Sequence, residues 1–425
     1  MLFSFVPFVP LVGAVTDAVS RSSGQRVVHR ARWVLPISQP PIDNGWVEVE
    51  NGLIVAVGGA ESIAPSPEAR APNPGHKSAI LPALVNAHTH LELSWMRGKV
   101  PPAASMTRWV EGLLALRGSV ELEPIEPITD AIREARASGT TLVGDITNTL
   151  VAYGPLADSD LSAAVFRELL GFNTADPEAL VRRTLETVET LTPIAWLRPA
   201  IVPHAPYSVA PSLMRAIGST SPERPISIHL GESAEEIEFL RTGTGPWRDL
   251  LTHLGVWSDS WIAPGTGPVE YIAAHGLLTA RLLAVHCVQL TDGELASLAR
   301  AGATVVTCPR SNRWVGAGEP PVDRFYRSGG RVAVGTDSLA SVEDLNLFSE
   351  LKAMRELAPS VPAREILASA TKHGADALGF GDELGTIEPR KRAELIEVSV
   401  PGDVRDVEEY LLSGISPSQV RWLFS

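Results

Sequence analysis

Residues 81–94 read LPALVNAHTHLELS, in which an apolar run leads directly into two histidines separated by one threonine. In an extended strand, side chains two residues apart point to the same side, so His88 and His90 can reach one metal ion together. A His-x-His pair alone is weak evidence, because many such pairs lie on protein surfaces. At the end of a buried strand, the pair predicts the first strand of a metal-binding α/β domain.

Seven further β-rich runs follow, most of them separated by segments with helical periodicity. The eight predicted strands are 84–87, 141–145, 164–168, 199–203, 226–230, 282–287, 303–308 and 332–335. Strands alternating with helices over about 250–300 residues are typical of a TIM barrel. The alternative, a doubly wound open sheet, usually carries a glycine-rich phosphate loop after its first strand. Here that position reads NAHTHLELS, which favours a (β/α)8 barrel.

Both ends of the chain read differently from this middle part. Residues 26–80 contain short strands and turns, with Asn51-Gly52 as a hairpin signal, and residues 383–425 contain the similar stretches GTIEPRKRAELIEVSV and VRWLF. We expect these two segments to form one small composite β-sandwich beside a barrel domain at 81–382. Residues 1–25 are predicted to be an apolar extension, because they contain prolines and no basic n-region of a signal peptide.

Charge and cysteine content narrow the class of protein. The formal net charge of −13 argues against nucleic acid or an anionic membrane surface as a partner. The two cysteines, Cys287 and Cys308, do not form a disulfide framework, which favours a reducing compartment. We therefore expect a cytoplasmic protein with a small-molecule substrate, and we allow for a homodimer.

The histidines gather where a barrel keeps its reactive groups, at the C-terminal ends of the strands. Five of the ten histidines fall there, and an aspartate follows the eighth strand; these residues are His88, His90, His204, His229, His286 and Asp337. Taken singly, each would be better interpreted as a packed core histidine or a solvated aspartate. Three imidazoles and one carboxylate suit Zn²⁺, with Fe²⁺ or Mn²⁺ as alternatives. We predict one divalent ion held by His88, His90, His229 and Asp337.

Further residues near these predicted ligands suggest proton transfer. Glu232 follows His229 by three residues and is interpreted as a proton carrier, although a first-turn acid of the next helix is an alternative, and both roles are compatible. His286 is expected to orient the attacking water or polarise the bond being broken. His204, in VPHAPYSVA, is predicted to contact substrate rather than to be a fifth metal contact. No lysine lies between Lys99 and Lys352, which excludes a two-metal site bridged by a carboxylated lysine on a middle strand.

Seven motifs in order resemble the amidohydrolase superfamily, in the branch of chlorohydrolases and nucleoside deaminases. They are LPALVNAHTHLELS, VPHAPYSVA, ISIHLGESAEEIEFL, LLAVHCVQL, VVTCPRSN, VAVGTDSLAS and GTIEPRKRAELI. The resemblance runs from Ala31 to the C-terminus and implies a TIM barrel with a β-sandwich. It also implies the same four metal ligands, catalytic roles for Glu232 and His286, and His204 on the substrate.

Two positions depart from the pattern of this branch. Glu394 stands in the closing motif that usually reads GKxAD, and Gln289 stands where a histidine or tryptophan is common, which puts one substrate contact in doubt. Within the branch, HTHLELS together with FLRTGTGPW is most similar to the bacterial aminodeoxyfutalosine deaminases of menaquinone synthesis and to unassigned neighbours of these enzymes. Residues 240–275, rich in glycine, proline and tryptophan, are interpreted as a lid or as a surface loop without function.

The resulting hypothesis is hydrolytic deamination of an aminated purine-type nucleoside, with aminodeoxyfutalosine or an adenosine derivative as the expected substrate. Water activated by the ion attacks the amine-bearing ring carbon, Asp337 and His286 deprotonate and orient it, Glu232 protonates the ring, and ammonia leaves. The residues expected to contact base or ribose are Trp109, Tyr207, Arg310 and Trp314. For Trp109 and Trp314, ordinary packing is an equally good interpretation.

Two alternatives remain from the sequence. The first is the same machinery acting on a triazine, guanine or a cyclic amide, which an ammonia assay on aminated and non-aminated rings distinguishes. The second is an inactive scaffold on the same fold, which would be expected to have lost metal ligands and to contain no stoichiometric metal.

Overall fold

The computed structural model describes residues 26–60, 62, 77–119, 124–220 and 223–424. The predicted apolar extension at 1–25 lies outside the described residues. Within the described part of the chain, no helix is both long and apolar enough to cross a membrane.

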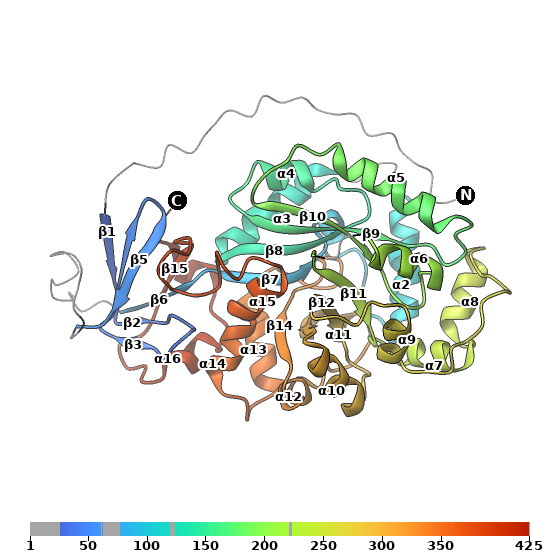
Figure 1. Ribbon diagram of the computed structural model, residues 1–425. Coiled ribbons are helices and arrows are strands. Elements are labelled where there is room, and N and C mark those ends of the chain that lie inside the picture. The colour runs from blue at the N-terminus through green and yellow to red at the C-terminus, as the bar shows by residue number, and fades with distance from the viewer. Residues whose placement is uncertain (1–25, 61, 63–76, 120–123, 221–222, 425) are drawn as a thin grey trace.

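All eight predicted barrel strands are present, in two parallel four-stranded sheets with the orders β10-β9-β8-β7 and β11-β12-β13-β14 (Figure 1). They are β7 (Leu84–Thr89), β8 (Thr140–Thr147), β9 (Ser162–Leu169), β10 (Leu197–Pro203), β11 (Ile226–Leu230), β12 (Leu282–His286), β13 (Thr304–Thr307) and β14 (Arg331–Val334). Backbone hydrogen bonds join the sheets at both seams: the Asp337 amide donates to the His88 carbonyl at 3.0 Å, and the His229 amide to the His204 carbonyl at 2.9 Å. The TIM-barrel prediction is confirmed.

The barrel interior is filled with apolar side chains. Val85 and Ala87 of β7, Leu142 and Ile146 of β8, and Phe166 of β9 belong to one buried cluster. Side chains alternate along a strand, so every second residue contributes to this core. Because the interior is packed rather than hollow, chemistry is confined to the strand ends.

Helices follow the strands and cover the barrel. They are η1 (Leu91–Met96), α2 (Met106–Arg117), α3 (Ile125–Ala137), α4 (Tyr153–Ala157), α5 (Pro177–Glu189), α6 (Pro211–Gly218), α7 (Ala234–Thr242), α8 (Pro246–His253), α9 (Pro268–Ala274), α10 (Asp292–Ala301), α11 (Pro309–Trp314), α12 (Val322–Arg327), α13 (Leu347–Leu357), α14 (Ala363–Ser369) and α15 (Lys372–Ala377). Local sequence sets several of their ends. Helix α10, for example, begins with a capping box formed by Thr291 and Glu294 and ends at Gly302, whose φ is 74°.

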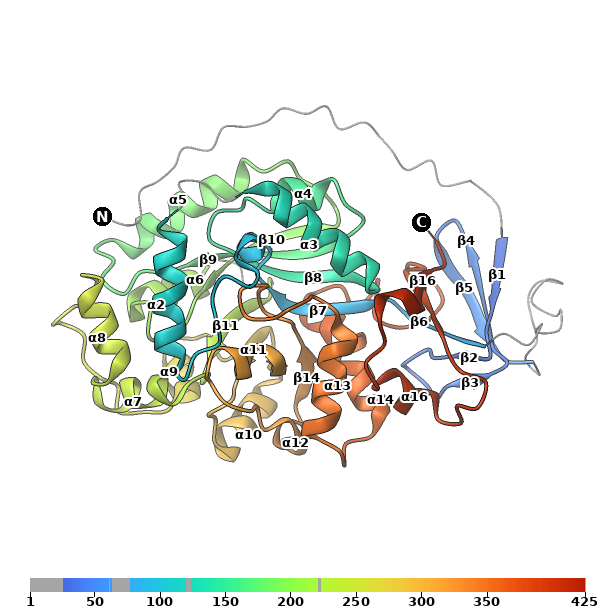
Figure 2. The same cartoon turned by 180° about the vertical axis from the view of Figure 1, so that it is seen from behind.

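The small domain uses both ends of the chain and lies at one side of the barrel (Figure 2). Its first sheet contains β1 (Arg26–Arg30), β4 (Trp46–Glu50) and β5 (Leu53–Gly58), and its second contains β2 (Trp33–Val34), β3 (Ile42–Asp43), β6 (Ser78–Pro82), β15 (Leu395–Ser399) and β16 (Val420–Trp422), with α16 (Val407–Leu411) and η2 (Pro417–Gln419) near by in the sequence. Strand β6 pairs antiparallel with β15, so residues more than 300 positions apart are neighbours. The composite domain is confirmed, while its limits at 80 and 383 stay predictions.

The Asn51-Gly52 turn connects β4 and β5. Both residues have positive φ, at 54° and 74°, which is the conformation that a two-residue hairpin turn of this kind requires.

Candidate active site

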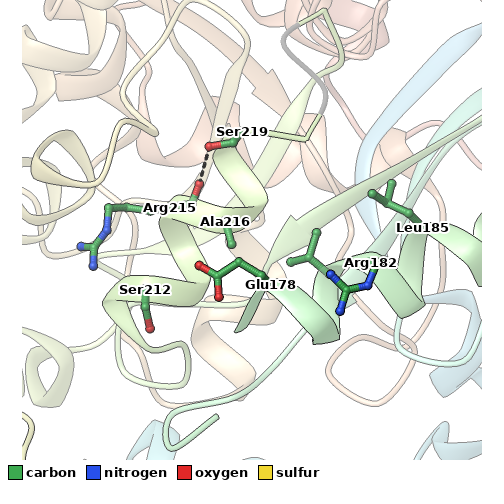
Figure 3. Close-up of a pocket in the computed structure, with 8 residues that line it drawn as sticks. Glu178, Arg182, Leu185, Ser212, Arg215, Ala216 and Ser219 are labelled. Atoms are coloured by element: carbon green, nitrogen blue, oxygen red, sulfur yellow. Dashed lines mark hydrogen bonds between the residues drawn. The ribbon is translucent and has the colours of Figure 1, made fainter. Parts of the chain in front are cut away.

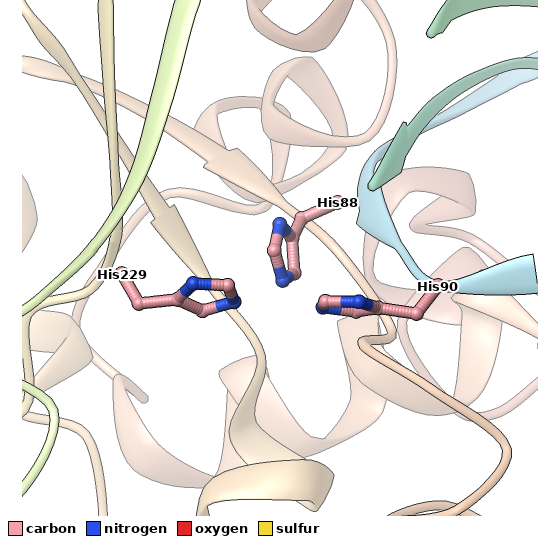
Figure 4. Close-up of side chains that lie close together, drawn as sticks. All are labelled: His88, His90 and His229. Atoms are coloured by element: carbon pink, nitrogen blue, oxygen red, sulfur yellow. The ribbon is translucent and has the colours of Figure 1, made fainter. Parts of the chain in front are cut away.

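The His-x-His pair lies where β7 ends. Figure 4 shows the imidazoles of His88, His90 and His229 converging on one point from two strands. One nitrogen of each ring lies within 4.8 Å of those of the other two. The ring centroid of His88 is 5.0 Å from that of His90 and 5.0 Å from that of His229.

Asp337 reaches the same point from the segment after β14. Its Oδ1 lies 3.4 Å from His90 Nε2 and 3.9 Å from His88 Nε2. The other oxygen, Oδ2, accepts a hydrogen bond from Ser311 Oγ at 2.6 Å, and Oδ1 also accepts one from the Ser338 amide at 2.8 Å. The structure therefore brings together all four residues that the sequence predicted as metal ligands.

The chemistry of these donors fits a divalent cation. Both ring nitrogens of His88 are buried without a hydrogen-bond partner among the described residues. Burial lowers the pKa of His90 and of His229 to about 4 and that of His88 well below its usual value, so these imidazoles are neutral and keep a lone pair. His229 Nδ1 lies 3.0 Å from the His204 carbonyl, to which its N–H donates, and this leaves Nε2 as the ligand atom.

Glu232 lies beside this cluster and is only 2% exposed. Its Oε2 is 3.5 Å from His286 Nε2. Burial, helped by the charge of Asp337, raises the pKa of Glu232 well above its usual value and so favours the protonated form. A buried, protonated carboxyl group next to the predicted metal ligands can donate a proton to a bound substrate.

Asn312, which the sequence analysis did not single out, connects the two groups. Its Nδ2 lies 3.0 Å from His286 Nδ1 and donates to Glu232 Oε1 at 3.3 Å. Ser311 and Asn312 are neighbours in α11, so one short helix contacts both Asp337 and Glu232. The signal was present in the sequence, because both residues belong to the VVTCPRSN motif after the seventh strand.

The backbone at this end of the barrel is unusual. His286, Cys287 and Asp337 have φ values of 73°, 56° and 61°, which non-glycine residues rarely adopt. Such conformations cost roughly 1–3 kcal/mol each and persist where surrounding structure enforces them, often at functional sites.

His204 and Tyr207 lie on the loop after β10. The His204 ring centroid is 4.8 Å from that of His229, and its Nδ1 is hydrogen-bonded to Ser208. Tyr207 stacks on Trp247 of α8 at 3.7 Å and meets His204 edge-on. Both predicted substrate contacts are therefore near the histidine cluster, and Trp247 ties the 240–275 segment to them.

The other three predicted substrate contacts make structural interactions. The Arg310 guanidinium donates to Glu350 at 2.7 Å and to Asp344 at 2.9 Å. Trp314 Nε1 donates to the Val100 carbonyl at 3.0 Å, and Trp109 packs in the main hydrophobic cluster. A substrate role for these side chains stays a prediction.

Two buried carboxylates at the strand ends were also missed. Glu92, in η1 directly after His90, and Glu168, at the end of β9, are 1% and 4% exposed. Glu168, His204 and His229 form a second group whose ligand-type atoms lie within 4.8 Å of one another. Both acids were visible in the sequence, in HTHLELS and at the end of the third predicted strand.

A hollow of about 390 Å³ also lies between α5 and α6, where charged side chains meet small ones (Figure 3). It is lined by Glu178, Val181, Arg182, Leu185, Ser212, Arg215, Ala216 and Ser219. These helices cover the outside of the barrel, so this hollow is separate from the histidine cluster.

The fold and the site define a class of protein. The profile of the amidohydrolase family matches residues 79–412, and the chain belongs to this family. Proteins of the family are metal-dependent hydrolases, and this chain is a hydrolase of carbon–nitrogen bonds other than peptide bonds, as expected from its motifs.

Individual relatives narrow the comparison. The chain is similar to the aminodeoxyfutalosine deaminase of Deinococcus radiodurans, with 34% identity over 71% of this chain and 74% of that protein. It is also similar to the 5-methylthioadenosine/S-adenosylhomocysteine deaminase of Moorella thermoacetica, with 29% identity over 86% of this chain and 84% of that protein. A solved adenosine deaminase from Xanthomonas campestris with bound zinc has 28% identity and a TM-score of 0.77, covering 92% of this chain and 90% of that one.

Proposed function

We propose that this protein is a hydrolytic deaminase of an adenosine-type nucleoside that uses one divalent cation. The observation that carries the proposal is Glu232, a buried acid with a raised pKa that lies beside His286 and next to the cluster of His88, His90, His229 and Asp337. The names of its relatives, which are deaminases of adenosine-type nucleosides, support the same chemistry.

The four clustered residues would hold the ion, with Zn²⁺ as the preferred metal and Fe²⁺ or Mn²⁺ as alternatives. When bound, the ion supplies a nucleophile near neutral pH by lowering the pKa of coordinated water. A single ion is proposed because the chain has no lysine between Lys99 and Lys352 to bridge a second one.

The protein's own groups carry the protons. Asp337 accepts a proton from the attacking water, with its Oδ2 held in place by Ser311. Glu232 donates its proton to the ring nitrogen, which makes the neighbouring amine-bearing carbon electrophilic. His286, held by Asn312 through Nδ1, faces Glu232 through Nε2 and orients the water. The proton taken up by Asp337 passes to the amine, which leaves as ammonia, and the remaining hydroxyl proton returns to Glu232 as the ring carbonyl forms.

Among adenosine-type nucleosides, aminodeoxyfutalosine is the proposed substrate, because the Deinococcus relative shares 34% identity. The Moorella relative makes 5-methylthioadenosine and S-adenosylhomocysteine the second candidates. His204 and Tyr207 are proposed to contact the bound substrate, and the 240–275 segment is proposed to cover it.

The test is a substrate panel on the purified, metal-loaded protein. Ammonia release is measured with aminodeoxyfutalosine, 5-methylthioadenosine, S-adenosylhomocysteine, adenosine, guanine, an aminotriazine and a cyclic amide. We expect ammonia from the adenosine-type compounds, released about 10²- to 10⁴-fold more slowly after Glu232→Gln. If a fully metal-loaded protein released ammonia from no aminated ring, the deaminase proposal would be wrong.

Metal analysis completes the test. We expect about one Zn²⁺, Fe²⁺ or Mn²⁺ per chain after purification without chelator. Two ions per chain would contradict the single-metal proposal, and none would favour an inactive scaffold.

A further inference from the structure

The side chain of Glu168 points into the end of the barrel that carries the histidines. Ala164 and Phe166, two and four residues earlier in β9, belong to the barrel interior. Side chains alternate along a strand, so Glu168 faces the same side one step further towards the open end. Its carboxylate forms a group with His204 and His229 in which the ligand-type atoms lie within 4.8 Å of one another.

Few groups of the protein donate hydrogen bonds to this carboxylate. Oε2 accepts from Asn148 Nδ2 at 2.9 Å. Oε1 lies 3.5 Å from His229 Nδ1, but that N–H is directed to the His204 carbonyl at 3.0 Å. Arg167 Nη1 donates to the backbone carbonyl of Glu168, and among the described residues no lysine or arginine pairs with the carboxylate.

Glu92, another buried carboxylate of this region, gives the contrast. It accepts from the Asn148 amide at 2.9 Å, from Thr147 Oγ1 at 2.7 Å and from Thr149 Oγ1 at 2.9 Å, and it pairs with Arg117 at 2.8 Å. A carboxylate has about four acceptor positions, and leaving them empty in a buried place is unfavourable. Glu92 is therefore satisfied by the protein alone, whereas Glu168 keeps acceptor capacity for a ligand.

We propose that Glu168 binds hydroxyl groups of the substrate's sugar and thereby selects a ribonucleoside over its deoxy analogues. This inference rests on the proposed function and adds a residue that determines specificity. The position fits, because Glu168 lies beside His204 and His229, while the sugar is attached directly to the ring that reacts next to His229. A hydroxyl group donates its hydrogen to Oε1 without bringing a second charge into a region of neutral imidazoles.

The test compares two substrates in two proteins. kcat and KM for deamination of adenosine and of 2′,3′-dideoxyadenosine are measured with the wild type and with Glu168→Ala, each loaded with Zn²⁺. A hydrogen bond to a charged group predicts that the wild type prefers adenosine by about 10- to 100-fold in kcat/KM. In Glu168→Ala the preference should shrink to within about threefold, because the hydroxyl groups have lost their acceptor.

Glu92→Gln is the matched control, since it neutralises a buried carboxylate of the same region that has its own partners. Glu92→Gln should change kcat/KM by the same factor for both substrates and keep the preference for adenosine. If Glu168 only oriented His229, Glu168→Ala would lose zinc and slow both substrates by the same factor, with the preference intact. That result, or a wild type without any preference, would overturn the proposal.

The affinities of inosine and 2′,3′-dideoxyinosine for the same proteins are measured by calorimetry. This measurement tests the role of Glu168 independently of the deaminase activity. Absence of ammonia from every aminated ring would contradict the deaminase activity alone. Equal binding of the two inosines to the wild type would contradict the role of Glu168, whether or not the protein deaminates.

Discussion

Glu232 and Glu236 are two buried acids, four residues apart, in which burial favours the protonated form. Burial raises the pKa of Glu232 well above its usual value and that of Glu236 to about 8. Glu236 accepts hydrogen bonds from the amides of Gly231 and Glu232, at 2.9 and 3.1 Å, and so holds the backbone that carries Glu232. The two acids therefore have different roles, one chemical and one structural.

Replacement of Glu232 by glutamine tests the chemical role. The amide cannot donate a proton as an acid does, so kcat should fall by about 10²- to 10⁴-fold. Metal content and melting temperature should change little, because the side chain keeps its shape. Retention of more than a tenth of kcat would contradict the assignment of Glu232 as the proton donor.

Titration of Glu236 predicts how stability depends on pH. The folded protein keeps the Glu236 proton up to about pH 8, whereas the unfolded chain loses it near the ordinary glutamate pKa of 4.5. The unfolded state thus binds fewer protons between these values, and the contribution of Glu236 to stability, complete below pH 4.5, decreases as pH rises to about 8. Chemical denaturation at pH 5, 6, 7 and 8 should show a shallower decline for Glu236→Gln than for the wild type. Parallel curves for the two proteins would contradict the raised pKa.

The seam between β14 and β7 positions two of the proposed metal ligands. Gly335 follows β14, and a Cβ atom built there would lie 2.6 Å from the His88 carbonyl oxygen and 2.8 Å from the His88 Cβ. Only a residue without a side chain allows the two backbones to approach this closely. The spacing of His88 and Asp337 therefore depends on a glycine that packs against the His88 backbone.

Gly335→Ala should push the seam apart. We expect a lower melting temperature and weaker zinc binding together, measured by thermal denaturation and by titration with a competing chelator. Gly154→Ala in α4 is the control, because its Cβ would meet nothing within 4 Å and an alanine there should be neutral or stabilising by up to about 1 kcal/mol. Equal zinc affinity in Gly335→Ala and the wild type would contradict the dependence on this seam.

The strands of the barrel are also the features that the sequence predicted best. Each barrel strand is a short apolar run bounded by polar turns, and the positions of His88, His229 and Asp337 at strand ends follow from that pattern alone. The contacts of Asn312 and Glu168 could not be predicted in this way. Their partners come from other strands and meet them only when the barrel closes, and the same reason explains why the ion pairs of Arg310 with Asp344 and Glu350 were not expected.

For the whole molecule, the proposed ligands come from distant parts of the barrel. His88 lies on β7 and His90 directly follows it, Asp337 follows β14, and His229 lies on β11 at the other seam. An ion bound by these four residues would connect the two four-stranded sheets. Binding only to the folded state stabilises it in proportion to the logarithm of ion concentration over Kd.

Removal of the metal should therefore lower the melting temperature by several degrees, and one equivalent of Zn²⁺ should restore it. The measurement is calorimetry on chelator-treated, dialysed protein whose metal content has been checked. A variant without the first ligands, His88→Ala with His90→Ala, should show no response to zinc. An unchanged melting temperature in protein verified to be metal-free would contradict the proposal that the ion connects the two sheets.

The pairing of β6 with β15 has a consequence for how the protein forms in the cell. During translation, β6 leaves the ribosome more than 300 residues before its antiparallel partner, with which it later pairs Leu81 opposite Ile396. For that interval one side of β6 has an open row of backbone donors and acceptors, the kind of edge that invites pairing between chains. Nascent chains stalled before residue 395 should therefore need chaperones to stay monomeric, whereas released full-length chains should not.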